Sequence, residues 1–94
     1  MRTIERSTSF RRDYRRIKAT PRYRDIDGLL TGVLECLVND EPLPESHRDH
    51  SLGGNWKGFR ECHVRPDLLL VYRKPPDAAV LQLVRLGSHS ELFG

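Results

Sequence analysis

Four side chains in the second half of this chain could transfer protons: His50, His63, Asp67 and His89. Histidine ionises near neutral pH, so an imidazole can both accept and donate a proton under those conditions. All four residues fall at the edges of short apolar runs, where strands are expected to meet loops. Taken singly, each is typical of a surface or turn position, and only their shared location indicates acid–base chemistry.

The elements around these residues predict a small antiparallel meander. Residues 57–64 alternate in polarity as a strand does, residues 68–72 form a buried apolar run, and residues 80–86 alternate again. The intervening Arg65-Pro66-Asp67 and Pro75-Pro76-Asp77 are turn sequences, because proline presets one backbone angle and aspartate bonds to the next backbone groups.

The meander places the four candidate residues at one edge of the sheet. His63 ends the first strand and Asp67 precedes the second, so the two residues flank one turn. The third strand ends level with the start of its predecessor, which brings His89 to the same end. We expect His50 to arrive there on the loop before the first strand, and Arg85 to lie close by at the end of the third.

The first half of the chain predicts two helices after an extended segment, residues 2–6. Phe10, Tyr14 and Ile17 follow the spacing of one helical stripe, after serine and threonine residues that can cap a helix. A second amphipathic stripe runs through residues 26–37. The order β-α-α-β-β-β predicts an α+β fold in which a helical hairpin packs on an antiparallel sheet, with a short C-terminal tail.

Length and composition limit the class of protein. A chain of 94 residues makes one domain, predicted here over residues 1–94. No run reaches the roughly 18 apolar residues of a membrane span, and the N-terminus lacks the apolar core of a signal peptide. Cys36 and Cys62 are isolated cysteines in apolar segments, which is typical of thiols in a reducing compartment. We therefore expect a cytoplasmic protein that does not bind membranes.

Charge is distributed unevenly along the chain. Residues 1–24 contain nine of the sixteen Lys and Arg residues and only two of the thirteen Asp and Glu residues. Such a segment is either a solvated helix face or a surface that meets phosphate groups. The acidic balance of residues 25–94 argues against a protein that coats nucleic acid indiscriminately.

Two kinds of chemistry fit the candidate set. Three histidines and an aspartate could ligate zinc, but no two of them have the spacing of a helical HxxxH pair or a zinc knuckle. RNA cleavage needs only a base that deprotonates the 2′-hydroxyl, an acid that protonates the leaving 5′-oxygen, and a cation for the phosphate charge. The spacing favours this second chemistry, without a metal or other cofactor.

Two segments carry a known family pattern. Residues 49–67 read DHSLGGNWKGFRECHVRPD, and residues 85–94 read RLGSHSELFG. They resemble the YafQ branch of the RelE-type bacterial toxins, whose pattern is D-H-x-L-x-G-x-W-x-G-[YF]-R-[DE]-x-H-v-x-P-D, followed by R-x-G-[ST]-H-x-x-L-F. The similarity covers essentially the whole chain, and the two motifs together are highly specific. Leu68 departs from the pattern, because the best-known members carry tryptophan at that position.

The resemblance implies a RelE-like fold and the toxin of a type II toxin–antitoxin system. Such toxins are mRNA interferases that cleave codons in the ribosomal A site without metal, inhibiting translation. The implied partners are mRNA, the ribosome with its rRNA, and a cognate antitoxin protein that neutralises the toxin. The basic first helix would then contact either ribosomal RNA or the antitoxin.

The resemblance also implies roles for individual residues. The implied catalytic set is His50, His63, Asp67 and His89. The implied contacts to RNA and phosphate are Arg85, Phe93, Lys57 and Arg60. His50 or Asp67 would be the base, and His89 or His63 the acid. The alternatives are a non-catalytic RNA- or ribosome-binding module of the same fold, and a structural partner that functions only within a complex.

Overall fold

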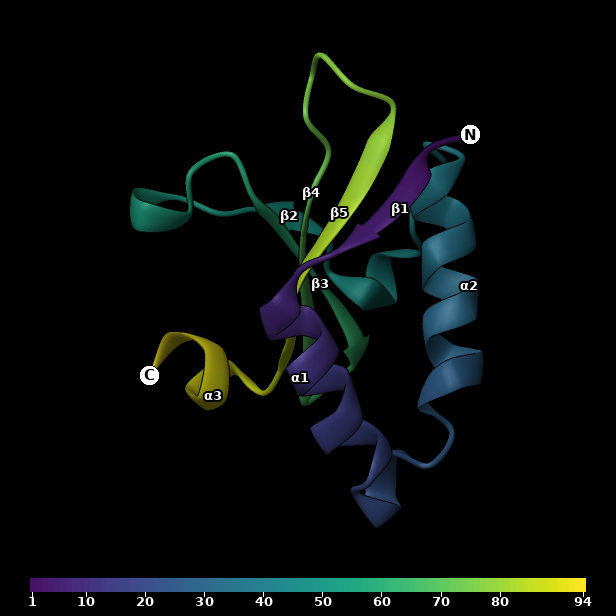
Figure 1. Ribbon diagram of the computed structural model, residues 1–94, viewed down its shortest axis with the longest axis vertical. Helices are drawn as coiled ribbons and strands as arrows, with labels where there is room; N and C mark the ends of the chain where they lie inside the picture. The colour runs from purple at the N-terminus through teal and green to yellow at the C-terminus, as the bar shows by residue number, and fades with distance from the viewer.

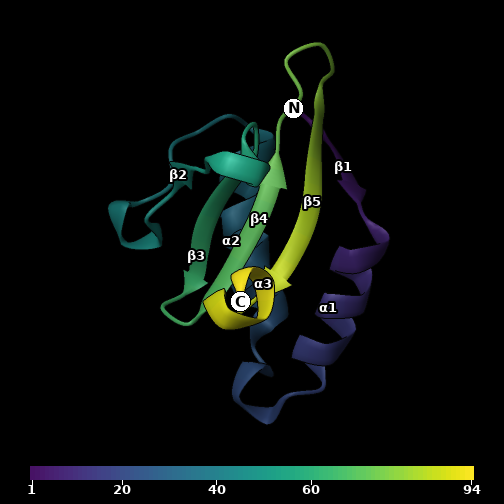
Figure 2. The ribbon, with the colours of Figure 1, turned by 90° about the vertical axis from the view of Figure 1, so that its left-hand side faces the viewer.

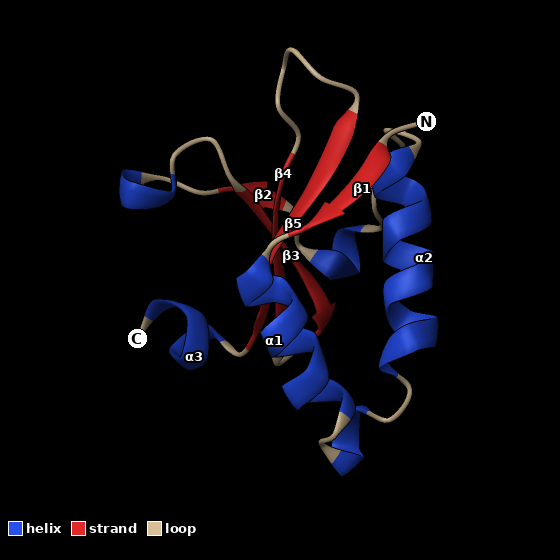
Figure 3. Cartoon of the chain, in the orientation of Figure 1, coloured by secondary structure: helices blue, strands red, loops and turns tan.

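A five-stranded sheet separates two layers of helices in the computed structural model, which describes residues 1–94 (Figure 1). The strands are β1 (Thr3–Arg6), β2 (His50–Ser51), β3 (Arg60–Arg65), β4 (Leu68–Arg73) and β5 (Val80–Gly87). The helices are α1 (Thr8–Lys18), α2 (Ile26–Val38) and α3 (His89–Phe93), and short 3₁₀ turns cover Pro21–Tyr23, Glu45–His47 and Gly54–Trp56. Helices α1 and α2 cover one face of the sheet, and α3 lies on the other (Figure 3).

The strand order is β1-β5-β4-β3-β2. Strands β3, β4 and β5 form the predicted antiparallel meander, so the α+β class is confirmed. The β-α-α-β-β-β order holds with one strand more, because His50 and Ser51, predicted to lie in a loop, pair with β3 as β2. The sheet is nevertheless mixed rather than antiparallel throughout, because β1 pairs parallel to β5, with Thr3 opposite Val80. Parallel pairing needs a long connection, and here both helices and two strands of the meander lie between the paired strands.

The two predicted helical stripes form the larger core. Phe10 and Ile17 of α1 are buried, with Tyr14 partly buried against them, and α2 buries its own stripe of four apolar residues. They pack on Cys62, Val64 and the buried residues of β4 and β5 that face the helices. Each fully buried apolar side chain of this kind stabilises the fold by about 1.5–3 kcal/mol.

Helix α1 also covers the edge of β5 beyond the point where β1 ends. The Ser7 hydroxyl caps α1 and donates a hydrogen bond to the Val84 carbonyl at 2.8 Å. Further along, the Leu86 N–H donates to Asp13 at 3.0 Å, and Arg16 donates to the Leu86 carbonyl at 3.3 Å. Side chains of α1 thus satisfy backbone groups that a neighbouring strand would otherwise bond.

The opposite face of the sheet carries a smaller apolar cluster beneath α3. Leu69 and Val71 of β4 pack against Leu92 of α3, with Trp56 and Phe93 partly buried beside them. Figure 2 shows α3 in front of the lower ends of β4 and β5, with α2 behind the sheet. The predicted C-terminal tail is therefore a short helix. No helix is both long and apolar enough to cross a membrane.

Candidate active site

The candidate site begins with a row of residues that crosses the sheet. His50 of β2 pairs with Glu61 of β3, Glu61 pairs with Val71 of β4, and Val71 pairs with Arg85 of β5. Residues directly opposite one another in antiparallel strands share a face, and neighbouring strands lie about 4.8 Å apart, so this row spans roughly 14 Å. The row lies on the face that carries α3, because Val71 packs in the cluster under that helix.

Glu61 joins two of the predicted histidines. Its Oε1 lies 3.5 Å from Nε2 of His50 and 4.0 Å from Nε2 of His63, and the residue is only 5% exposed. Sequence reasoning missed Glu61 as a site residue. The signal was present, since strand alternation places it on the same face as His63, two residues away.

The two imidazoles are oriented by backbone carbonyls. Nδ1 of His50 lies 2.7 Å from the Arg48 carbonyl, and Nδ1 of His63 lies 3.2 Å from the Pro66 carbonyl. A carbonyl oxygen only accepts hydrogen bonds, so each Nδ1 carries the proton. In the neutral form, Nε2 of each ring therefore presents its lone pair toward Glu61. A proton gained at either Nε2 turns that contact into an ion pair with the carboxylate.

Asp67 has partners outside the histidine group. Its Oδ2 accepts a hydrogen bond from the Tyr23 hydroxyl at 2.8 Å, and Arg22 forms an ion pair with the same oxygen. These contacts lower the pKa of Asp67 below its ordinary value, the Tyr23 hydrogen bond most of all. Burial, followed by the same hydrogen bond, raises the pKa of Tyr23. The β3–β4 turn places Asp67 near His63, as predicted, but its contacts face the 3₁₀ turn after α1.

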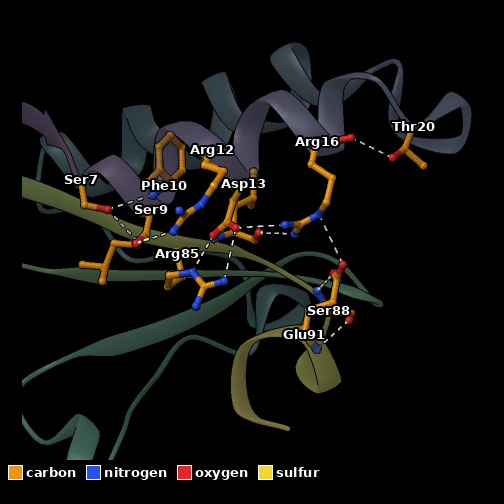
Figure 4. A network of polar contacts seen from close by, with 12 residues as sticks. Ser7, Ser9, Phe10, Arg12, Asp13, Arg16, Thr20, Arg85, Ser88 and Glu91 are labelled. Atoms are coloured by element: carbon orange, nitrogen blue, oxygen red, sulfur yellow. Dashed lines mark hydrogen bonds and ion pairs between the residues drawn. The ribbon is translucent and has the colours of Figure 1, made fainter.

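Arg85 is held by a buried carboxylate (Figure 4). Its Nε donates to Asp13 Oδ2 at 2.7 Å, and Nη2 donates to Oδ1 at 3.3 Å. Burial alone would raise the pKa of Asp13, but the hydrogen bonds from Arg85, from the Leu86 N–H and from Arg16 hold it below its ordinary value. Asp13 in turn raises the pKa of Arg85.

Asp13 is a second residue that sequence reasoning missed. It is 1% exposed, although it lies in the strongly basic first helix. Its spacing from Phe10 and Ile17 places it on the buried stripe of α1. An acidic residue at an apolar position of a basic helix was the available signal for a buried ion pair.

His89 and Phe93 lie together on α3. Their ring centroids are 5.2 Å apart, and Phe93 meets Trp56 edge-on at 5.5 Å. Phe93 is therefore partly buried against Trp56 rather than free at the end of the chain. The pairing of His63 with Leu69, and of Leu69 with Gly87, brings the start of α3 toward the His63 end of the sheet.

The other two predicted RNA contacts differ in their surroundings. Lys57 is exposed in the loop after Trp56 and forms no ion pair. Arg60 shares the helix-covered face with Cys62, and donates to Asp49 at 3.2 Å and to the Tyr72 hydroxyl at 3.3 Å. Arg60 thus anchors the residue before His50 from the opposite face of the sheet, and its contacts do not point toward the row.

The geometry can be compared with what a metal ion requires. No group of three or more His, Cys, Asp or Glu side chains is arranged to hold one. The pair of histidines around Glu61 instead shares one carboxylate, with their Nδ1 atoms occupied by carbonyl oxygens. This arrangement orients imidazoles for proton transfer.

Residues 2–94 match the family described as the bacterial toxin of type II toxin–antitoxin systems, YafQ. The chain belongs to the YafQ family. The mRNA interferase toxin YafQ of Escherichia coli K12 is 37% identical over 93 residues, which cover 99% of this chain and 97% of that protein.

Solved structures of similar proteins share the fold. A copper-bound mutant toxin from Helicobacter pylori is 40% identical, with a TM-score of 0.86 over 99% of this chain and 100% of that one. A chain of the E. coli DinJ–YafQ toxin–antitoxin complex is 37% identical, with a TM-score of 0.82 over 99% and 98% of the two chains. The YafQ family predicted from residues 49–67 and 85–94 is confirmed, while the roles of individual side chains stay predictions.

Proposed function

We propose that this YafQ-family toxin is a ribosome-dependent endoribonuclease that cleaves mRNA in the A site without metal. Full-length similarity to an mRNA interferase supports the reaction class. The observation that carries the proposal is the row of His50, Glu61 and Arg85 across one face, with His89 close to one end of the sheet. Such a row offers a base, an acid and a phosphate-binding cation without a cofactor.

His50 is the proposed base. Its Nδ1–H donates to the Arg48 carbonyl, which leaves the Nε2 lone pair free to take the proton of the 2′-hydroxyl. Glu61 lies 3.5 Å away and stabilises the imidazolium that this transfer creates. Asp67, the other predicted base, has a lowered pKa and is paired with Arg22, so it is the weaker proton acceptor at neutral pH.

His89 is the proposed acid. Its side chain is exposed on the first turn of α3, and neither ring nitrogen is hydrogen-bonded within the chain. The 2′-oxygen attacks the adjacent phosphorus, the bond from phosphorus to the 5′-oxygen breaks, and that oxygen takes the His89 proton. The products are a 2′,3′-cyclic phosphate and a 5′-hydroxyl, so atoms and charge balance without water or metal.

Arg85 and Phe93 complete the proposed site. Asp13 occupies Nε and Nη2 of Arg85, which leaves Nη1 free to donate to a phosphate oxygen. Phe93 is partly exposed between His89 and Trp56, where its ring can support a base of the bound RNA. His63 lies on the other side of Glu61 and would exchange protons with the same carboxylate.

A groove between α1 and α2 supports the proposal that a protein partner binds there. Apolar side chains form its floor, and three arginines lie along it. The floor residues are Phe10, Tyr14, Leu30, Leu34 and Leu83, and the arginines are Arg6, Arg11 and Arg15. Ribosomal RNA would satisfy the charge alone, whereas an acidic amphipathic helix of a cognate antitoxin satisfies both the charge and the apolar floor. Because the substrate is translated mRNA, the proposed site of action is the cytoplasm.

The test is induced expression in a bacterial host, with mapping of mRNA 5′ ends. The proposal predicts new in-frame 5′ ends on translated messages, and none on the same message without a start codon. Growth arrest without new 5′ ends would instead indicate a non-catalytic ribosome-binding module. With purified ribosomes at constant Mg²⁺, cleavage should persist in 1,10-phenanthroline, which removes transition metals, and its loss would reject the metal-free mechanism.

A further inference from the structure

We propose that Asp13 is a positioning residue for this site, holding Arg85 directly and α3 through Arg16 and Glu91. The inference rests on the proposed function, because it assigns α1 the task of placing Arg85 relative to His89. Figure 4 shows the polar network that joins α1, β5 and α3.

Both carboxylate oxygens of Asp13 accept hydrogen bonds. Oδ2 accepts from Arg85 Nε at 2.7 Å and from the Leu86 N–H at 3.0 Å. Oδ1 accepts from Arg16 Nη1 at 3.1 Å and from Arg85 Nη2 at 3.3 Å. Arg85 is therefore gripped along one edge of its guanidinium, which fixes the direction of the remaining Nη1.

An acidic residue is unusual at this position of the helix. Asp13 lies on the buried stripe of α1, between the apolar residues Phe10 and Ile17. Replacing a buried ion pair by apolar residues is often neutral or stabilising, so a buried salt bridge is weak evidence for a stabilising role. The partner of Asp13 is the proposed phosphate-binding arginine, which favours a role in positioning.

The second branch of the network reaches α3. Arg16, bound to Asp13, lies with its Nε 3.4 Å from Glu91 Oε2. Glu91 Oε1 accepts the Ser88 N–H at 2.8 Å, and the Ser88 hydroxyl accepts the Glu91 N–H, forming a capping box. Glu91 thus ties the first turn of α3, which carries His89, to α1.

Gly87 leaves room for this bridge. A Cβ added at Gly87 would lie 3.1 Å from Arg16 Nη2, from Glu91 Oε1 and from Leu92 Cδ2. The bridge therefore passes directly over the last residue of β5, and a Cβ there would require its atoms to shift by a few tenths of an ångström. The Asp13 carboxylate on α1 thus sets both the direction of the Arg85 guanidinium and the position of the first turn of α3.

The principal test compares single-turnover cleavage of ribosome-bound mRNA at saturating toxin. Asp13→Asn should lower the rate constant on the order of 10- to 100-fold, because small misplacements of catalytic groups have effects of this size. Asp13→Asn should slow the Arg85→Ala variant less than it slows the unsubstituted protein, since Arg85→Ala already removes the Arg85 branch and leaves only the α3 branch. A rate constant for Asp13→Asn within twofold of the unsubstituted protein, or effects that multiply, would overturn the proposal.

Asp27→Asn is the matched control. Asp27 of α2 also anchors α1, through Lys18 and Tyr14, but it contacts no residue of the network. If loosening α1 were sufficient to slow cleavage, Asp27→Asn would slow it equally, and the positioning role would be rejected. We expect its rate constant to stay within twofold of the unsubstituted protein.

Two further measurements separate the possible failures. If Asp13→Asn does not fold, Glu91→Gln keeps the capping box but loses the charge that meets Arg16. It should slow cleavage about threefold or more, and an unchanged rate would reject the α3 branch.

The second measurement is hydrogen exchange of the Arg85 Nε–H group, followed by ¹⁵N NMR. This hydrogen should be protected from exchange with solvent in the unsubstituted protein and should lose that protection in Asp13→Asn. This signal tests the hydrogen bonds from Arg85 to Asp13 even if the unsubstituted protein proves inactive on ribosomes. Protection that persists in Asp13→Asn would show that Asp13 does not hold Arg85.

Discussion

Glu61 of β3 stands directly opposite His50 of β2, and its buried carboxylate lies 3.5 Å from Nε2 of that histidine. The same oxygen lies 4.0 Å from Nε2 of His63. Both histidines donate through Nδ1 to backbone carbonyls, so their other nitrogens converge on one acid. This relationship supports the proposed proton-transfer site, because one carboxylate joins two histidines that would otherwise be separate.

Replacing Glu61 with Gln should strongly reduce mRNA cleavage. The substitution keeps the shape of the side chain but removes the charge that stabilises an imidazolium at His50, and acid–base groups contribute about 10²- to 10⁴-fold. We expect a loss of about 10²-fold in single-turnover rate on programmed ribosomes. Glu61→Asp keeps the charge and should recover part of the rate. Glu45→Gln, on an exposed 3₁₀ turn, is the matched control, and equal rates for the two Gln variants would remove Glu61 from the site.

His89→Ala should abolish mRNA cleavage and growth arrest while leaving antitoxin binding intact. His89 is exposed on α3, and the groove proposed for the antitoxin lies between α1 and α2. Cleavage and growth arrest are measured after induction, and binding by co-purification with the antitoxin. His47→Gln is the control, because His47 bonds only the backbone carbonyl of His63 and glutamine can keep that bond. Full toxicity of His89→Ala would exclude His89 as the acid.

The elements of the fold were predictable because they depend on local patterns. The stripe from Phe10 to Ile17 has helical spacing, and the alternation through Cys62 and Val64 has strand spacing. Strand order then brought His63 and the start of α3 toward one end of the sheet. The parallel pairing of β1 with β5 was not predictable, since nothing local marks which edge of the meander a distant strand joins.

The sequence also could not predict which residues the charged side chains contact. Asp13 meets Arg85, 72 positions away, and Asp67 meets Tyr23, 44 positions away. Only the packing of α1 and the following turn against the sheet brings these pairs together. For Arg60, strand alternation already placed the residue on the face of Cys62, so its position away from the row follows the same rule that predicted the strand.

The stability of the fold should depend on the charge of Asp13. Its folded-state pKa is lowered, so its contribution is complete above the ordinary carboxyl range and is lost as the pH falls through the folded-state value. Near neutral pH, Asp13→Asn should lower the free energy of unfolding by about 1–3 kcal/mol, because the charge is lost and an NH2 donor replaces one of the two oxygens that accept from Arg85, Arg16 and the Leu86 N–H. Urea denaturation should show this difference narrowing below about pH 4. A difference that is constant down to about pH 2.5 would contradict the ion pair.

The two cysteines should react at very different rates in the folded protein. Burial raises the pKa of the Cys62 thiol to about 12, whereas Cys36 is only partly buried. The thiolate is the reactive form, so iodoacetamide at about pH 8 should label Cys36 first and reach Cys62 only after unfolding. Mass spectrometry of tryptic peptides distinguishes the two sites, and the Cys62→Ala variant serves as control. Rapid labelling of Cys62 under native conditions would contradict its packing in the core.

The most direct measurement of the central claim uses one mRNA bound to the ribosome in two forms. The first carries ribose at every position, and the second carries a single 2′-deoxynucleotide on the 5′ side of the A-site cleavage position. If the site activates the 2′-hydroxyl, the first message is cut to a 2′,3′-cyclic phosphate and a 5′-hydroxyl, and the second stays intact at that position. Cleavage of the deoxy-substituted message at the same bond would show that water is the nucleophile and would contradict the proposed mechanism.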